Sequence, residues 1–204
     1  MNAPQHAHPT PVIAPRPMPA EMVDALRARF GDRCSTAMAV RELHGRDESP
    51  FDVPPPDAVV YCESNQDVID AVRLADRFAV PVIPYGVGSS LEGHLLAVQG
   101  GLSLDLSRMN RILEINETLA YAVVEPGVTY QAMYDELVRR GNKLMLDVTS
   151  GPPQGGMLGN ALDKGAGYGP YFDHFGFSCG MEVVLANGEI LRTGDGALDS
   201  PDIS

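Results

Sequence analysis

Pro84-Tyr-Gly-Val-Gly-Ser-Ser-Leu-Glu-Gly-His94 is the stretch that decides the fold, because it follows a short apolar run, residues 80–83, and holds three glycines. Glycine adopts positive φ at little steric cost and has no Cβ, so successive backbone N–H groups can approach an anion such as a diphosphate. Lysine and arginine are absent from residues 84–101, so backbone dipoles would have to neutralise such a ligand. The stretch therefore predicts an anion-binding loop.

Two common phosphate motifs do not fit this loop. A Walker loop requires a Lys-Ser/Thr pair after its last glycine, whereas Gly93 is followed by His94 and Leu95. The dinucleotide fingerprint requires glycines at its first, third and sixth positions, but here they stand at 86, 88 and 93. An ordinary glycine-rich turn and a loop for a flavin dinucleotide are the alternatives that remain open for this stretch alone.

Composition limits the class of protein. The chain has 204 residues, 44% of them apolar, which is enough for one globular domain with a sizeable core. A formal net charge of -12 argues against nucleic acid or an anionic membrane surface as a partner. Cys34, Cys62 and Cys179 form no CxxC pair, so neither a disulfide framework nor a metal site is predicted. A reducing, cytoplasmic compartment fits best, and a peripheral place at the inner face of a membrane stays open.

The N-terminal part divides into a leader and a connection. Residues 1–18 contain five prolines and little continuous apolar sequence, unlike a signal peptide or a membrane span. We expect them to be a disordered leader. Residues 19–54 are expected to form one amphipathic helix, at 19–31, and an extended connection. The connection belongs to the charged segment of residues 40–56, which carries four prolines. The main domain is expected to span residues 55–204.

The first half of the main domain is predicted to form a strand-helix-strand crossover unit. Residues 57–62 look like a buried strand, residues 64–79 have helical spacing after a capping box of Ser64 and Asp67, and residues 80–83 form a second strand. Such a crossover normally makes the two strands parallel. The glycine-rich loop then lies at the carboxyl end of the second strand, where open α/β sheets usually bind ligands.

The second half has a β-rich pattern. Strands are predicted at residues 102–106, 111–115, 120–124 and 143–148. Residues 180–185 and 189–193 flank Asn187-Gly188, which predicts a hairpin. A helix capped by Thr129 and ended by Gly141 is predicted to present one apolar face, made of Tyr130, Met133, Tyr134, Leu137 and Val138.

Several segments, in order along the chain from about residue 40, resemble the vanillyl-alcohol-oxidase/p-cresol-methylhydroxylase superfamily of FAD enzymes. Five segments look most like its D-lactate and glycolate dehydrogenase branch: Val40-Arg-Glu-Leu-His-Gly-Arg-Asp-Glu-Ser49, Pro55-Pro-Asp-Ala-Val-Val60, the Pro84 to Gly93 loop, Leu102 to Asn110, and Val124-Glu-Pro-Gly-Val128. Two later segments look more like its 4-alkylphenol and vanillyl alcohol branch: Gly159-Asn-Ala-Leu-Asp-Lys-Gly-Ala-Gly-Tyr-Gly-Pro-Tyr-Phe-Asp-His174 and Gly180-Met-Glu-Val-Val-Leu-Ala-Asn-Gly188.

The resemblance implies the fold and the cofactor. The fold is α+β: a PCMH-type FAD-binding domain with a small strand-helix-strand subdomain and a second, mainly antiparallel β subdomain. In the family a substrate domain follows. We therefore expect the chain to be a C-terminally incomplete piece, without the last strands of the FAD domain and without the substrate domain, and inactive alone.

The resemblance also assigns candidate cofactor contacts, in three groups. The FAD diphosphate is assigned to Pro84, Tyr85, Gly86, Val87, Gly88, Ser89, Ser90 and Leu91, with the two serine hydroxyls as additional donors. The ribityl chain and the isoalloxazine ring are assigned to Gly151, Gly155, Gly156, Gly159 and Asn160. Pro126 and Gly127 end a strand and are candidates either for a flavin contact or for a plain turn.

Tyr168 is the candidate catalytic residue. The tyrosine of its motif contacts a phenolate in the alkylphenol branch, and a hydroxyl can stabilise developing oxygen charge. That branch's catalytic aspartate would fall at residues 149–151, where no carboxylate stands. We interpret His94 as structural or solvent-facing rather than as a covalent flavin attachment. Asp173 and His174 are neighbours on an extended segment, so their side chains are expected to face apart and not to form a dyad.

Together these features predict an oxidoreductase that moves a hydride from a hydroxyl-bearing carbon to FAD. A D-2-hydroxy acid such as lactate or glycolate is the first substrate hypothesis, and a 4-alkylphenol or vanillyl alcohol type substrate is the second. The rival hypothesis is a non-catalytic flavin-binding module or truncated remnant, because the chain contains no complete acid-base set. The expected partner is a small-molecule substrate. An electron-acceptor protein, covalent flavin attachment and the oligomeric state stay open.

Overall fold

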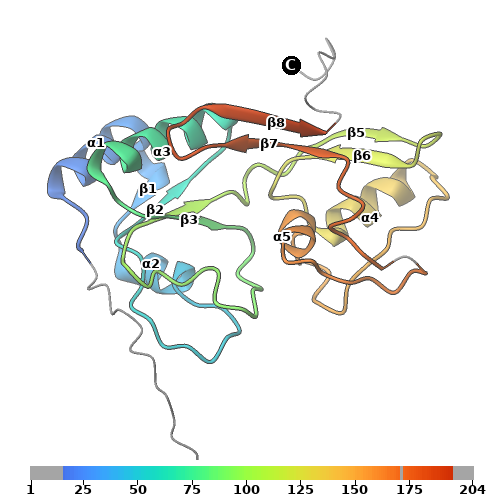
Figure 1. Ribbon diagram of the computed structural model, residues 1–204, viewed down its shortest axis with the longest axis horizontal. Coiled ribbons are helices and arrows are strands. Elements are labelled where there is room, and N and C mark those ends of the chain that lie inside the picture. Colours follow the sequence, from blue (N-terminus) through green and yellow to red (C-terminus); the bar gives the residue numbers. More distant parts are fainter. Residues whose placement is uncertain (1–15, 171, 195–204) are drawn as a thin grey trace, which may run out of the picture.

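The computed structural model describes residues 16–170 and 172–194, and Figure 1 shows a helix-covered sheet beside a second group of strands and helices. The first group comprises α1 (Ala20–Phe30), the 3₁₀ turn η1 (Gly31–Arg33), β1 (Cys34–Ser35), α2 (Met38–His44), β2 (Ala58–Tyr61), α3 (Asn65–Phe78), β3 (Val82–Tyr85) and β4 (Leu102–Asp105). The second comprises β5 (Ile112–Asn116), β6 (Tyr121–Val124), α4 (Tyr130–Arg139), α5 (Met157–Leu162), β7 (Gly180–Val184) and β8 (Ile190–Gly194). The mixed content confirms the α+β class.

The first sheet has the strand order β1-β2-β4-β3. β2 and β3 both pair with β4 in parallel, so the predicted parallel crossover through α3 is confirmed. β4 lies between the two strands that α3 connects, and the four residues of β4 are all buried. The alternating pattern of residues 102–106 had suggested a strand of the later, β-rich half. Its polar members Ser103 and Asp105 are instead buried inside the parallel sheet.

α3 follows its sequence pattern closely. The Ser64 hydroxyl accepts a hydrogen bond from the Asp67 N–H at 3.2 Å, which caps the helix. The Asp67 carboxylate reaches the Glu63 N–H at 3.0 Å instead of the cap residue itself. The buried face of the helix includes Ile69 and Val72, which pack toward the sheet and α1. The predicted helix is therefore confirmed.

The second core is smaller. β5 and β6 form the predicted hairpin, and the Thr129 hydroxyl accepts from the Ala132 N–H to cap α4. Met133 and Leu137 of α4 are buried against this hairpin. The predicted five-residue apolar face is wrong in part. Tyr134 and Val138 are 55% and 59% exposed, because the hairpin covers only one side of the helix.

Two further expectations are wrong. Residues 143–148 contain no strand: the Leu144 N–H bonds to the Asn142 side chain, and no ladder partner lies beside the segment among the described residues. Residues 38–44, most of which were assigned to an extended connection, form α2. Its last residue, His44, is buried in the first core, and this tertiary contact explains why a short helix forms in a charged stretch.

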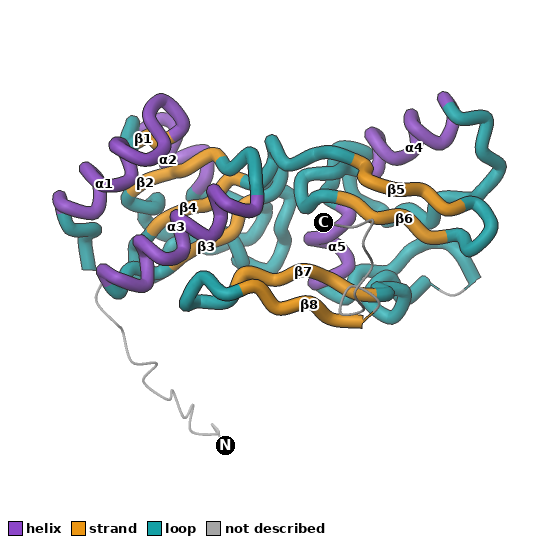
Figure 2. The backbone as a smooth tube through the Cα atoms, turned by 90° about the horizontal axis from the view of Figure 1, so that it is seen from above, coloured by secondary structure: helices purple, strands orange, loops and turns teal. Residues whose placement is uncertain are grey.

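The β7–β8 hairpin is confirmed, with Gly188 at φ 76° in its turn. Figure 2 shows the hairpin reaching from the second group of elements toward α3. Asn65 donates to Glu182 at 2.6 Å, and Arg73 donates to the Gly188 carbonyl at 3.3 Å. These bonds join the β7–β8 hairpin to α3 of the first group.

The three cysteines differ in accessibility. Cys62 is fully buried, and burial raises its pKa to about 12; Cys34 is half-buried and Cys179 is exposed. Because the thiolate is the reactive form, we expect Cys179 to be alkylated first in the native protein and Cys62 only after unfolding. Mass spectrometry after brief iodoacetamide treatment measures this, with Cys179→Ser as the control. Equal labelling of Cys62 and Cys179 in the native protein would contradict the described core.

The expected leader, residues 1–18, lies largely outside the described residues. Of its described part, Met18 packs against the first core. Among the helices that the structure describes, none is both long and apolar enough to cross a membrane.

Candidate functional site

The glycine-rich loop begins where β3 ends. β2, β3 and β4 run parallel and stop in register at Tyr61, Tyr85 and Asp105, so these residues mark the carboxyl edge of the sheet. The loop, residues 86–93, leaves from this edge. Within the described part of the chain, none of the backbone N–H groups of residues 86–91 donates to an acceptor. Six consecutive donors are therefore available for a ligand.

Gly86 and Gly88 differ in why they are glycine. Gly88 has φ 75°, and a Cβ there would lie 2.6 Å from the Tyr85 hydroxyl, so the local chain requires glycine. Gly86 has no positive φ, and nothing lies within 4 Å of where its Cβ would be. The free protein therefore gives no steric reason for glycine at 86, whereas a ligand lying on the backbone would.

A buried polar cluster packs against Tyr85, the residue that directly precedes this loop. The His44 side chain is 2% exposed, and its Nε2 lies 2.8 Å from Asp105 Oδ2, while its Nδ1 donates to the Val40 carbonyl at 2.8 Å. The His44 ring also packs on the Tyr85 ring, with centroids 4.3 Å apart. Burial raises the pKa of Tyr85, and the charge of Asp105 adds to this effect. Tyr85 therefore stays a neutral donor at the base of the loop.

Hydrogen bonds set the charge state of Asp105. Burial alone would raise its pKa, but bonds from His44 and Ser107 outweigh burial and hold the pKa below the usual value. The carboxylate is thus ionised and paired inside the core. Sequence reasoning missed this pair, because His44 was assigned to an extended connection and Asp105 was considered only as a member of a predicted strand.

Pro126 and Gly127 follow β6, and the structure gives Gly127 a packing reason to be glycine. Its N–H donates to the Met109 carbonyl at 2.7 Å, and a Cβ there would lie 2.5 Å from the Leu106 carbonyl oxygen. The close approach of two backbones explains this glycine without a ligand. A flavin contact at Pro126 and Gly127 stays a prediction.

The second glycine region forms a turn and α5, a helix that the sequence had not indicated. Gly155 is buried, its N–H donates to the Pro152 carbonyl, and its carbonyl accepts from Tyr130. Gly156 precedes α5, and both Gly159 and Asn160 lie within the helix. Gly151 is exposed in the preceding loop. The isoalloxazine and ribityl contacts assigned to these residues stay predictions.

His94 and Asp163 connect the two glycine regions. His94 Nδ1 lies 2.9 Å from Asp163 Oδ1, and Asp163 directly follows α5. The His94 side chain is 61% exposed, which agrees with its interpretation as solvent-facing. The end of the first loop and the C-terminal end of α5 therefore lie side by side, although His94 and Asp163 are 69 positions apart in the sequence.

Tyr168, the candidate catalytic residue, is 76% exposed. Its N–H donates to Asp147 Oδ1 at 2.9 Å. His174 does not pair with Asp173 among the described contacts, as predicted; it contacts Tyr130, Asn160 and Asp147 instead. Asp147 belongs to the segment wrongly expected to be a strand, and its role left no signal in the local sequence pattern.

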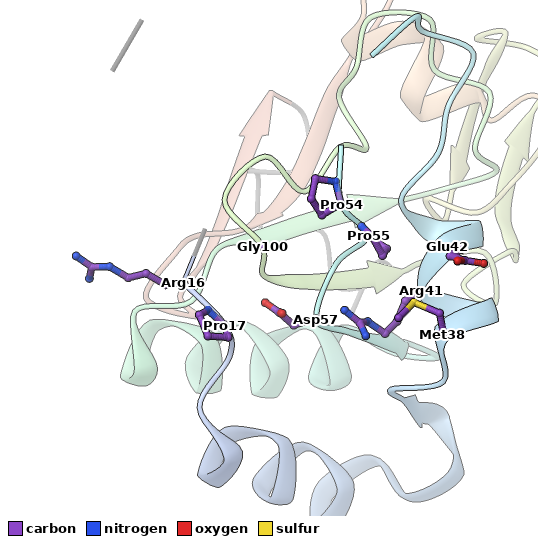
Figure 3. Close-up of a pocket in the computed structure, with 9 residues that line it drawn as sticks. All are labelled: Arg16, Pro17, Met38, Arg41, Glu42, Pro54, Pro55, Asp57 and Gly100. Atoms are coloured by element: carbon purple, nitrogen blue, oxygen red, sulfur yellow. The ribbon is translucent and has the colours of Figure 1, made fainter. Parts of the chain in front are cut away.

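A cavity of about 280 Å³ lies elsewhere (Figure 3). It is lined by Asp57 and Gly100, which precede β2 and β4 and so mark the amino-terminal edge of the sheet, opposite the glycine-rich loop. Asp57 accepts from the Gly101 N–H, and Arg41 donates to the Pro56 carbonyl. These polar groups serve the fold. No cluster of three or more potential metal ligands occurs among the described side chains.

Comparison with known proteins identifies the class. The family described as "FAD binding domain" matches residues 56–194, so the chain belongs to this family. The 4-cresol dehydrogenase flavoprotein subunit of Pseudomonas putida is 39% identical over 145 residues, which are 70% of this chain and 28% of that protein. The mitochondrial D-lactate dehydrogenase (cytochrome) of Arabidopsis thaliana is 30% identical over 187 residues, 90% of this chain and 32% of that protein.

The solved structures agree with the family. The structure of p-cresol methylhydroxylase with substrate bound superposes with a TM-score of 0.83 at 31% identity, over 91% of this chain and 38% of that chain. The fold is the PCMH-type FAD-binding fold of the vanillyl-alcohol-oxidase/p-cresol-methylhydroxylase superfamily, and the cofactor is FAD. The chain spans about a third of the length of the relatives that it matches.

The residues present fit this cofactor. A diphosphate requires hydrogen-bond donors, and the carboxyl edge of the sheet offers the free N–H groups of residues 86–91 with no acidic side chain among them. The glycines leave room for close approach of the ligand to the backbone.

Proposed function

We propose that residues 86–91 bind the FAD diphosphate through their backbone N–H groups. The observation that carries this proposal is the row of six free donors at the carboxyl end of β3. Backbone dipoles can neutralise a diphosphate without basic side chains, and none is present between residues 84 and 101. The second glycine region and Asn160, which lie beside the loop through the His94–Asp163 contact, would line the rest of the cofactor.

We expect the purified chain to bind FAD with a dissociation constant of about 10 µM or tighter, followed by quenching of flavin fluorescence. Gly86→Ala separates a ligand contact from a folding requirement, because the free protein has open space at that Cβ. Its melting temperature should stay within about 2 °C of the wild type, while the FAD affinity falls at least about 10-fold. Unchanged FAD affinity in this variant would place the diphosphate elsewhere.

We further propose that the chain is the FAD-binding part of an oxidoreductase acting on a hydroxyl-bearing carbon. Bound FAD supplies the hydride acceptor, and the protein orients it against the substrate. A D-2-hydroxy acid is the first candidate substrate. It is supported by the resemblance of five segments between residues 40 and 128 to the D-lactate and glycolate branch, and by the 90% of this chain that aligns with a D-lactate dehydrogenase.

A 4-alkylphenol is the second candidate. The exposed Tyr168 side chain and the 39% identity to a 4-cresol dehydrogenase subunit favour it. Anaerobic mixing of the FAD-loaded chain with D-lactate or with 4-cresol distinguishes the two, because reduction bleaches the flavin band near about 450 nm. L-Lactate is the control for the first substrate. If neither compound bleaches the bound flavin, the result agrees with the expectation that this chain is inactive alone, and the two substrates are then compared in a longer protein that carries this domain together with a substrate domain.

A further inference from the structure

The Asp147 carboxylate holds the loop that presents Tyr168. Its Oδ1 accepts two backbone hydrogen bonds, from the Tyr168 N–H at 2.9 Å and from the Gly169 N–H at 2.7 Å. A carboxylate that accepts from two adjacent backbone N–H groups makes charge-assisted bonds, which are stronger than bonds between neutral groups. The bonds join the loop to a segment about 20 residues earlier in the chain.

The glycines of this loop are explained by the same carboxylate and by Asn160. A Cβ at Gly167 would overlap the Asp147 carboxylate, a Cβ at Gly169 would lie 3.0 Å from it, and a Cβ at Gly165 would overlap the Asn160 side chain. The loop backbone therefore wraps around two polar side chains. A side chain at any of these three glycines would displace Asp147 or Asn160 from its present position.

The other Asp147 oxygen extends the network inward. Oδ2 lies 3.5 Å from His174 Nε2, which is within ion-pair distance but outside hydrogen-bond geometry, and that nitrogen is buried with no hydrogen-bond partner. His174 Nδ1 contacts Asn160 Oδ1 and the Tyr130 hydroxyl. The His174 N–H also donates to the Gly165 carbonyl, which closes the loop.

Tyr130 completes the network from α4. Its hydroxyl donates to Asn160 Oδ1 at 2.9 Å, and burial, with a contribution from the Asp147 charge, raises its pKa to about 12. The hydroxyl therefore keeps its proton near neutral pH and remains a donor to Asn160. Asn160 is one of the predicted flavin contacts, so one connected set of side chains joins the flavin side to the Tyr168 loop.

We propose that Asp147 is a positioning residue, which fixes the Tyr168 loop and, through His174, the Asn160 side chain at the flavin site. The Tyr168 hydroxyl has no partner among the described residues and is left free to meet a substrate. This proposal rests on the proposed function only for the position of the Tyr168 loop beside the flavin. Whether Asp147 holds the loop in place can be tested in the protein without FAD.

The test compares Asp147→Ala with Asp147→Asn in hydrogen exchange, read by mass spectrometry of peptides that cover residues 165–170. We expect exchange of the Tyr168 and Gly169 amides to rise at least about 10-fold in Asp147→Ala, because both bonds are lost. Asp147→Asn keeps an oxygen acceptor in the same place and should restore protection to within about threefold. Asp135→Ala, which removes an exposed carboxylate of α4, is the matched control and should change nothing in this loop.

The visible circular dichroism of bound FAD provides a second measurement. A purely structural role of Asp147 would leave this spectrum unchanged. We expect it to change in Asp147→Ala and to return in Asp147→Asn, while the FAD dissociation constant changes by less than about threefold, since the diphosphate loop is untouched. If the wild-type chain binds no FAD, the proposed function fails. The hydrogen-exchange result still tests whether Asp147 holds the Tyr168 loop.

A steric variant covers the case in which Asp147→Ala does not fold. Gly167→Ala pushes the carboxylate away from the loop and should produce the same local rise in exchange. Unchanged exchange at Tyr168 and Gly169 in the folded variants would overturn the proposal. So would a rise spread evenly over the whole chain, which would show general destabilisation instead of a local hold.

Discussion

Gly88→Ala is expected to lower the affinity for FAD by about 100-fold or more, equivalent to about 2.7 kcal/mol. Gly88 has φ 75°, where an alanine is strained, and the added methyl group would lie 2.6 Å from the Tyr85 hydroxyl. The loop has to move to relieve this contact, and the N–H groups on either side of residue 88 move with it. A fluorescence titration of the purified variant with FAD measures the loss.

Two companion variants separate the causes. Gly141→Ala has a similar positive φ of 65° but no atom near its Cβ and no place in the loop, so it should bind FAD like the wild type. The double variant Tyr85→Phe/Gly88→Ala removes the hydroxyl, after which the closest ring atom lies 3.3 Å from the methyl group. It should regain part of the lost affinity relative to Gly88→Ala. Wild-type binding by Gly88→Ala would contradict the assignment of the loop.

Asp105→Asn is expected to reduce the free energy of unfolding by about 3 kcal/mol, because it leaves His44 buried without its charged partner. Removing a buried carboxylate that accepts a hydrogen bond from a buried partner costs far more than removing an exposed one. Asp163→Asn, which breaks the exposed contact to His94, is the matched control and should have a much smaller effect. Urea denaturation at pH 7 measures both variants.

The pH dependence of this difference has a defined sign. The pKa of Asp105 is lowered in the folded protein, so the stability it contributes is present above its unfolded-state pKa, about 3.9, and is lost as the pH falls through the lower folded value. The part of the gap between wild type and Asp105→Asn that comes from the Asp105 carboxylate should therefore narrow as the pH falls below about 4. A gap that is already closed at pH 5 would mean that the carboxylate is not held by His44.

Elements with strong local signals were predicted from the sequence. α3 carries a capping serine and a clear apolar face, and the β7–β8 hairpin carries Asn187-Gly188 at its turn. In both cases the element is about 15 residues long, and these residues themselves contain the capping or turn residue and the periodicity that define it. The glycine-rich loop was placed correctly at the end of β3 for the same reason.

Elements that depend on distant partners were not predicted. Residues 143–148 have the alternation of a strand but find no neighbour to pair with, and Asp147 turns to the Tyr168 loop instead. The strand at residues 102–106 was predicted and is present as β4, but its burial between two parallel strands was not predicted. Local periodicity indicates that the two faces of a strand differ in polarity. It does not indicate which other elements cover each face.

The sequence placed the glycine-rich loop at the end of β3 through short-range turn chemistry, and its resemblance to a known family implied the class of fold and the cofactor. Only the tertiary structure decided which polar side chains meet. Asp105 joins His44 across 61 residues, and Asp147 joins the N–H of Tyr168 across 21. A buried carboxylate is stabilised by whichever donors the fold brings within 3 Å, and that distance is set by packing between separate elements.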